Sequence, residues 1–174
     1  MATIVLTAGH GGKDPGAVNG KATEAELMAQ LRNATKKALE DLGHKVITDG
    51  YGHENLTLAD AIRLIPKGLM AIELHTNASS NKTAGGVETI GNAKHAQLCR
   101  DISAEIAAVL NLPLRRDRGW FDYKNTGRTL GYCRAGGLIV EAFFISNDSE
   151  LAAFNKNYWA VARGIARAVD KHVK

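Results

Sequence analysis

The sequence predicts one α/β domain over residues 1–174, with about six strands in a mostly parallel or mixed sheet and helices on both faces. The length of 174 residues suits a single domain. Short apolar segments alternate with segments in which apolar residues recur at helical spacing. Hydrophobic residues make up 45% and charged residues 23%, which excludes disordered, collagen-like and coiled-coil classes.

The expected strands are apolar or β-branched runs bounded by glycine, proline or polar residues. They are Thr3–Ala8, Lys45–Thr48, Leu69–Leu74, Val87–Ile90, Thr129–Cys133 and Gly137–Phe143. The expected helices are a long one from Thr23 to the cap at Gly43, then Thr57–Ile65, Lys94–Leu110, a short one from Asn147 or Asp148, and Tyr158–Val173. The first of these begins with a capping box, in which Thr23 is the N-cap and Glu26 the third helical residue.

No apolar run approaches the roughly 20 residues that a membrane-spanning helix needs, and the N-terminus lacks a basic, apolar leader. We therefore expect cytoplasmic synthesis without a signal peptide. Cys99 and Cys133 form no C-x-x-C pair and are expected to be buried small side chains rather than nucleophiles.

The net charge of +4 is concentrated in one segment between Pro113 and Arg134. This basic segment favours an anionic partner, which could be a nucleic acid, an anionic lipid or an acidic wall polymer. A solvated loop is the simpler alternative, and the charge pattern does not separate the two.

Three residues suggest a metal site. His10 and His75 each follow a predicted strand, and Glu24 stands in the first turn of the first long helix. Two imidazoles and one carboxylate form a catalytic zinc set with an open fourth position. From spacing alone the signal is weak, because isolated histidines are common and a helix dipole favours an acid in its first turn. The glycines around His10 match neither a P-loop nor a dinucleotide-binding fingerprint.

The sequence motifs around these residues are more specific than their spacing. Thr7–Ala17 resembles the opening motif of zinc-dependent N-acetylmuramoyl-L-alanine amidases of the amidase-3 group. Further blocks resemble that family in the same order: Thr23–Leu27, Leu74–Ala78, Gly85–Glu88 and Ile139–Asn147.

The resemblance implies that His10, Glu24 and His75 hold one Zn²⁺ per chain and that Glu141 is the catalytic acid/base. The implied reaction is hydrolysis of the amide between N-acetylmuramic acid and L-alanine of the stem peptide. Glu26 is the rival of Glu24, but it points about 200° around the helix and is explained by its capping role. Without the motif, Glu141 could equally be half of a buried ion pair.

Two departures from the family pattern stand near the motifs. Glu73 replaces a small residue and could accept the second ring proton of a histidine. Asp49 replaces an arginine after the second strand, which leaves substrate contacts there open. Candidate substrate-binding residues are Asn77, Arg115, Arg116 and Trp120.

We expect peptidoglycan as the partner, with no nucleic-acid partner, no stable membrane insertion and a monomeric chain. The expected lack of a leader or a separate wall-binding domain favours a phage or prophage endolysin released through a holin, or else a catalytic domain cut from a longer protein. A zinc carboxypeptidase or other amide hydrolase is the alternative enzyme. A catalytically silent wall-binding module is the alternative from a different class, and it would lack a ligand or the base.

Overall fold

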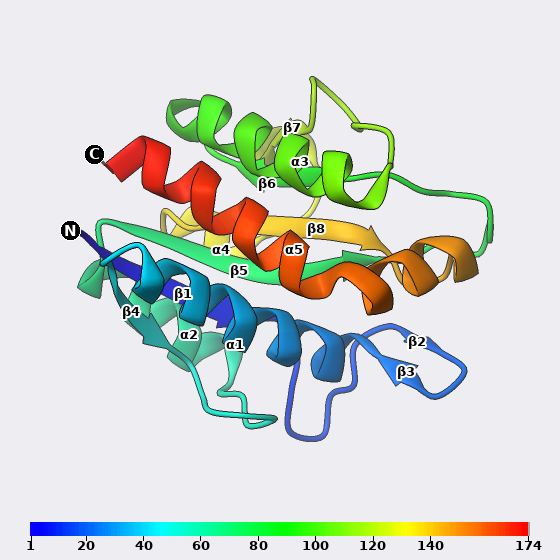
Figure 1. Ribbon diagram of the computed structural model, residues 1–174, viewed down its shortest axis with the longest axis horizontal. Coiled ribbons are helices and arrows are strands. Elements are labelled where there is room, and N and C mark those ends of the chain that lie inside the picture. Colours follow the sequence, from blue (N-terminus) through cyan, green and yellow to red (C-terminus); the bar gives the residue numbers. More distant parts are fainter. Residues whose placement is uncertain (174) are drawn as a thin grey trace.

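A six-stranded sheet forms the centre of the computed structural model, which describes residues 1–173 (Figure 1). The strand order is β4-β1-β5-β8-β6-β7. The strands are β1 (Thr3–Ala8), β4 (Lys45–Thr48), β5 (Met70–Asn77), β6 (Glu88–Gly91), β7 (Trp120–Asp122) and β8 (Leu138–Phe144). All neighbours pair in parallel except β6 and β8, which are antiparallel. The predicted α/β fold with a mostly parallel sheet is confirmed.

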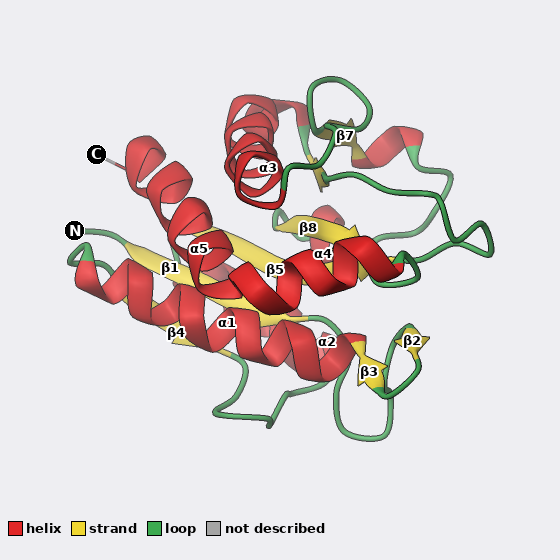
Figure 2. Ribbon diagram, turned by 45° about the vertical axis from the view of Figure 1, so that its right-hand side comes forward, coloured by secondary structure: helices red, strands yellow, loops and turns green. Residues whose placement is uncertain are grey.

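Helices cover both faces of the sheet, but unequally (Figure 2). The long helices α1 (Glu24–Asp41), α3 (Ala96–Leu110) and α5 (Asp148–Val173) lie together on one face, while the short helices α2 (Leu58–Leu64) and α4 (Gly131–Arg134) lie on the other. A hairpin of β2 (Val18–Asn19) and β3 (Ala22–Thr23) precedes α1, and single 3₁₀ turns occupy Ile65–Lys67, Ala93–His95 and Tyr123–Asn125.

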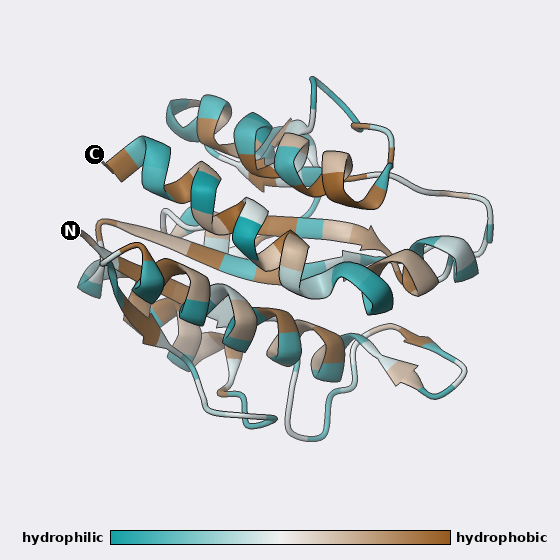
Figure 3. Ribbon diagram, viewed as in Figure 1, coloured by the Kyte–Doolittle hydropathy of each residue, from teal (hydrophilic) through white to brown (hydrophobic). Residues whose placement is uncertain are grey.

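The two faces of the sheet bury cores of different size. The larger core lies under α1, α3 and α5, whose ribbons carry both hydrophobic and hydrophilic residues (Figure 3). In it, the ring of Phe143 in β8 stacks on Phe154 of α5 with centroids 4.5 Å apart. The smaller core includes Ile139 of β8 and Tyr132 of α4. Because short helices cover this second face, part of it is open at the carboxyl ends of β1, β5 and β8.

Two sequence predictions about elements need correction. Thr129–Cys133 is not a strand, because residues Gly131–Arg134 form α4, and β7 takes the edge position of the sheet instead. The apolar run there serves to bury Tyr132 and Cys133 in the second core, which a short helix does as well as a strand. The two predicted C-terminal helices are one, α5, since Phe154 in its first half already packs on the sheet.

Within the described part of the chain, no helix is both long enough and apolar enough to cross a bilayer. Cys99 and Cys133 are free and buried, as predicted, although Cys133 lies in α4 and not in a strand.

Candidate metal centre

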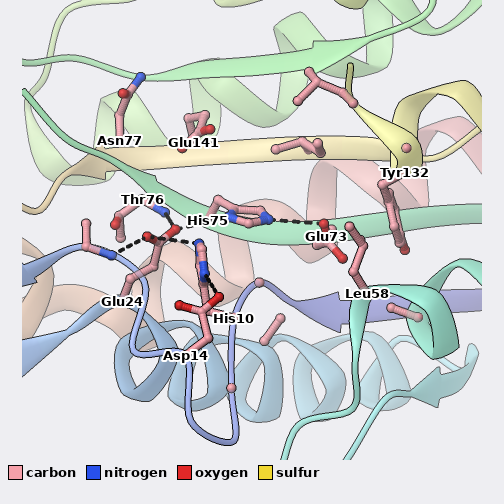
Figure 4. A pocket seen from close by; sticks show the side chains of 18 of the residues that line it. His10, Asp14, Glu24, Leu58, Glu73, His75, Thr76, Asn77, Tyr132 and Glu141 are labelled. Atoms are coloured by element: carbon pink, nitrogen blue, oxygen red, sulfur yellow. Dashed lines mark hydrogen bonds and ion pairs between the residues drawn. The ribbon is translucent and has the colours of Figure 1, made fainter. Parts of the chain in front are cut away.

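His10 in the loop after β1, Glu24 at the start of α1 and His75 in β5 meet at the carboxyl ends of β1 and β5 (Figure 4). One possible ligand atom from each lies within 4.8 Å of the other two. The imidazole rings of His10 and His75 are nearly perpendicular, with centroids 5.2 Å apart. The structure therefore brings together the three residues that the sequence singled out as metal ligands.

The backbone around His10 is shaped to bring this ring close to His75. His10 has a φ of 65°, in the left-handed region that few non-glycine residues adopt. A Cβ at the preceding Gly9 would lie 2.1 Å from Cε1 of His75, so only glycine permits the approach. The side-chain amide of Asn55 donates to the carbonyl oxygens of Ala8 and His10, which anchors the turn.

Glu24 is the first residue of α1 and its carboxylate lies between the two rings. Its Oε2 is 3.3 Å from Nε2 of His10, and its Oε1 is 3.0 Å from Nδ1 of His75. Backbone N–H groups of Ala17 and Thr76 donate to the same two oxygens and fix the carboxylate. Although burial opposes it, hydrogen bonding to His75 lowers the pKa of Glu24. The group is therefore held as an anion, which is the form that binds a cation.

Glu26 does not compete for this position. Its backbone N–H donates to the Thr23 hydroxyl, which in turn donates to the Glu26 carboxylate at 3.1 Å. Thr23 is thus the N-cap of α1 and Glu26 its third helical residue, as predicted, although the glutamate accepts from the Thr23 hydroxyl and not from the backbone N–H of a full capping box. Glu24, and not Glu26, belongs to the group of residues whose ligand atoms meet here, so Glu24 stays the proposed ligand.

The outer nitrogen of each ring has its own carboxylate partner. Nδ1 of His10 lies 2.8 Å from Oδ2 of Asp14, and Nε2 of His75 lies 3.0 Å from Oε1 of Glu73. Carboxylates in this position orient metal-binding histidines and select the tautomer that presents a free nitrogen to the ion. Two imidazole nitrogens and one carboxylate form the donor set, and hydrogen bonds to neighbouring groups orient all three side chains. Such a set fits a Zn²⁺ ion with an open coordination position.

The electrostatics of His75 reflect the surrounding acids. Burial disfavours the charged ring, but hydrogen bonds with Glu24 and Glu73 outweigh burial and raise the pKa of His75 to about 10. This concentration of negative charge attracts a cation, and a metal ion would compete with the proton for the same ring nitrogen.

Glu141 lies beside the three residues without joining them. It stands in β8 directly opposite His75 in the parallel register, so both side chains emerge on the same face of the sheet. Its side chain is buried, and its Oε2 has no hydrogen-bond partner among residues 1–173. Burial raises the pKa of Glu141 to about 7, and the nearby Glu24 and Glu88 charges add to this against the opposing charge of His75. The sequence left open that Glu141 is half of a buried ion pair. Within residues 1–173, its carboxylate forms no such pair.

The family model described as N-acetylmuramoyl-L-alanine amidase, Amidase_3, matches residues 4–171. The chain belongs to this family. It is 41% identical to a protein of known crystal structure that is described as the "putative N-acetylmuramoyl-L-alanine amidase from Neisseria meningitidis". That likeness covers 99% of this chain and 96% of the other, with a TM-score of 0.93.

Two further relatives are more distant. The germination-specific N-acetylmuramoyl-L-alanine amidase of Bacillus subtilis (strain 168) is 25% identical over 178 residues, which cover 88% of this chain and 71% of that protein. The catalytic domain of the amidase CwlV from Bacillus (Paenibacillus) polymyxa var. colistinus is 23% identical with a TM-score of 0.81, and it covers 99% and 98% of the two chains. The CwlV domain shares the fold of this chain. The resemblance drawn from sequence motifs is thereby confirmed at the level of the family.

A pocket of about 670 Å³ opens at the candidate centre of this amidase. His10, Glu24, His75 and Glu141 all line it, and so does Asn77. The side-chain amide of Asn77 donates to Glu88 at 3.0 Å, and its oxygen accepts from the next backbone N–H. Asn77 is therefore held in place at the pocket wall, and its contact with substrate stays a prediction.

The other three candidate substrate residues lie outside the pocket lining. Arg115 and Arg116 both direct Nε at the buried carboxylate of Glu88, at 3.2 and 3.0 Å. The indole N–H of Trp120 donates to the carbonyl oxygen of Gly91. These three side chains therefore bind other groups of the protein and do not line the pocket. Their contact with substrate stays a prediction.

Sequence reasoning missed two residues that line the pocket, Asp14 and Arg128. Asp14 could have been found, since it stands four residues after His10 in a turn closed by hydrogen bonds between Gly11 and Asp14. Arg128 belongs to the basic segment, but nothing in the local sequence distinguishes it from the other arginines there.

Proposed function

We propose that this amidase hydrolyses the amide between the lactyl group of N-acetylmuramic acid and L-alanine of the stem peptide, using one Zn²⁺ held by His10, Glu24 and His75. The observation that carries the metal proposal is the meeting of these three side chains, with Asp14 and Glu73 orienting the two rings from behind. Membership of the amidase family supplies the bond that is cleaved.

A Zn²⁺ ion bound there supplies Lewis-acid chemistry, which lowers the pKa of a water and polarises an amide carbonyl. Glu141 takes the proton of the attacking water and then delivers it to the departing alanine amine. The site of Glu141 suits both steps, because its pKa of about 7 lets the carboxyl accept and release a proton at neutral pH. Its free Oε2 leaves one oxygen available for this exchange.

The residues around the centre keep this arrangement rigid. Glu24 is fixed by two backbone N–H groups, and His10 by the Asn55 amide. Preorganised groups need not rearrange during the reaction, which is where enzymes gain much of their rate.

Other sequence-based predictions stay predictions. They are the endolysin origin, release through a holin, a monomeric state, the absence of a nucleic-acid partner and a catalytic domain without a separate wall-binding domain.

The test is to incubate the protein with purified muropeptides, with and without a chelator, and to identify the broken bond by mass spectrometry. The proposal expects a free N-terminal alanine, no new reducing ends, and loss of activity with the chelator. Release of a C-terminal amino acid instead would indicate a carboxypeptidase, and full activity in the chelator would refute the metal.

A variant tests the role of Glu141. Glu141→Gln is expected to keep zinc but lose about 10²- to 10⁴-fold in turnover, the usual contribution of a general acid/base. Glu26→Gln is the matched control, since it changes a glutamate of the capping box that does not line the pocket. Normal turnover in Glu141→Gln would remove this residue from the mechanism.

A further inference from the structure

The pocket of this amidase is strongly acidic and contains one arginine. Asp14, Glu24, Glu73 and Glu141 line it, and Arg128 is the one lysine or arginine among the described lining residues. Asp14, Glu24 and Glu73 are each paired with a histidine, so apart from the candidate metal centre itself Arg128 is the positive group that the described lining offers to an anionic substrate. Arg128 marks the part of the pocket where negative charge is attracted.

The guanidinium of Arg128 is available for a ligand. Its side chain is exposed, and within residues 1–173 it forms no ion pair or side-chain hydrogen bond. Of the lining carboxylates, Asp14 pairs with His10 and Glu73 with His75. Glu141 feels the positive charge of Arg128, but no hydrogen bond or ion pair joins the two side chains within residues 1–173. By contrast, Arg115 and Arg116 of the same segment are already engaged by Glu88.

The backbone that carries Arg128 is held in position. The Thr126 hydroxyl donates to the carbonyl oxygen of Tyr123 at 2.8 Å and accepts from the backbone N–H of Arg128 at 3.2 Å. Gly127 between them has a φ of 68°, which glycine adopts without strain. The turn is therefore built before any ligand arrives, which lowers the ordering cost of binding.

The two halves of the substrate differ in charge. Once the lactyl carboxyl is part of the scissile amide, the N-acetylmuramic acid side carries no charge, whereas the stem peptide carries free carboxylates. An arginine guanidinium binds a carboxylate through two parallel hydrogen bonds. The cationic part of the pocket thus suits the peptide side of the scissile bond.

We propose that Arg128 is a specificity-determining residue that binds the free carboxylate of the second stem-peptide residue, next to L-alanine. The proposal rests on the amidase function proposed above. The proposal also predicts how the substrate lies in the pocket: the stem peptide extends from the scissile bond toward the turn that carries Arg128.

The test uses two muropeptides that differ in one group, with either D-glutamate or D-isoglutamine as the second stem residue. The first has a carboxylate where the second has a carboxamide. We expect kcat/KM to be about tenfold higher for the acid, the lower end for a hydrogen bond to a charged group because Arg128 is exposed. Arg128→Gln should abolish this preference, mainly through KM, and Arg128→Lys should keep part of it.

Arg163→Gln is the matched control, because Arg163 is an exposed arginine of α5, which packs on the opposite face of the sheet. It should leave the preference unchanged. Equal use of both muropeptides by the wild-type protein, or an equal loss on both in Arg128→Gln, would overturn the proposal while leaving the amidase function intact.

Equilibrium binding of the two muropeptides to the zinc-loaded Glu141→Gln protein, with and without Arg128→Gln, tests the same preference without turnover. If the wild-type protein cleaves neither muropeptide at the lactyl amide, the proposed function fails. The binding ratio still decides the role of Arg128.

Discussion

Replacing Arg32 with methionine should destabilise the fold and loosen the metal centre together. Arg32 of α1 and Asp49 after β4 are both fully buried, and Nη1 of the arginine lies 3.1 Å from Oδ1 of the aspartate. The same nitrogen donates to the carbonyl oxygen of Glu54 and to Oδ1 of Asn55. Methionine preserves the apolar stem but removes every one of these contacts.

The expected magnitude follows from burial. Removing one partner of a buried ion pair leaves the other charge without compensation, which costs about 3–5 kcal/mol. Asp49 would lose the cation that pairs with it and would keep the backbone N–H of Ala8 as a donor at 3.3 Å. At about 2–4 °C per kcal/mol for a chain of this size, the thermal midpoint should fall by roughly 10 °C.

The effect should reach the candidate metal centre through Asn55. Arg32 binds the oxygen of the Asn55 side chain, and the amide nitrogen of that side chain holds the carbonyl oxygens of Ala8 and His10. Without Arg32 the asparagine loses its orientation, and the left-handed turn at His10 loses support. We therefore expect weaker zinc binding although no proposed ligand is changed.

The assay is urea unfolding of the zinc-free protein together with zinc titration of the folded protein. Arg32→Met combined with Asp49→Asn should recover part of the stability, because the second change removes the uncompensated charge. Arg63→Met is the control, since the Arg63 side chain is 76% exposed and its surface pair with Asp60 should contribute about 1 kcal/mol or less. A loss below about 1 kcal/mol in Arg32→Met, or a double variant no more stable than the single one, would refute this reasoning.

Three further predictions concern the metal, the basic segment and pH. His75→Ala should lower the zinc:protein ratio sharply in metal analysis, and an unchanged ratio would contradict the ligand assignment. Changing Arg115 and Arg116 to alanine should lower the thermal midpoint, because the buried Glu88 carboxylate loses both cations, and should weaken wall binding more at low salt than at high salt. An equal loss of binding at both salt concentrations would exclude electrostatic attraction. Although burial opposes it, hydrogen bonds with Lys171 and His172 of α5 lower the pKa of Asp101 from 3.8 to about 2. The stabilisation that Asp101 contributes is therefore present above pH 3.8 and is lost as the pH falls toward 2. Asp101→Asn should therefore reduce unfolding free energy at pH 7 but not at pH 2, and an equal difference at both pH values would contradict the linkage.

Local signals in the sequence predict much of the fold correctly. The capping box at Thr23 predicts where α1 begins, and the β-branched run Thr3–Ala8 predicts β1. These signals work because capping and strand propensity depend on neighbours within a few residues. They fail at Thr129–Cys133, where burial of Tyr132 against the sheet decides the conformation.

By itself, the sequence indicated the family and the α/β fold class, and it singled out His10, Glu24, His75 and Glu141 as candidate site residues. It could do so because motifs and periodicity are read along the chain. Only the tertiary structure decided what those residues face. Asp14 and Glu73 bind the outer ring nitrogens of the two histidines. Arg115 and Arg116 pair with Glu88, whereas Arg128 lines the pocket. The reason is physical: an arginine's role depends on which acids lie within a few ångströms, and those acids come from distant parts of the chain.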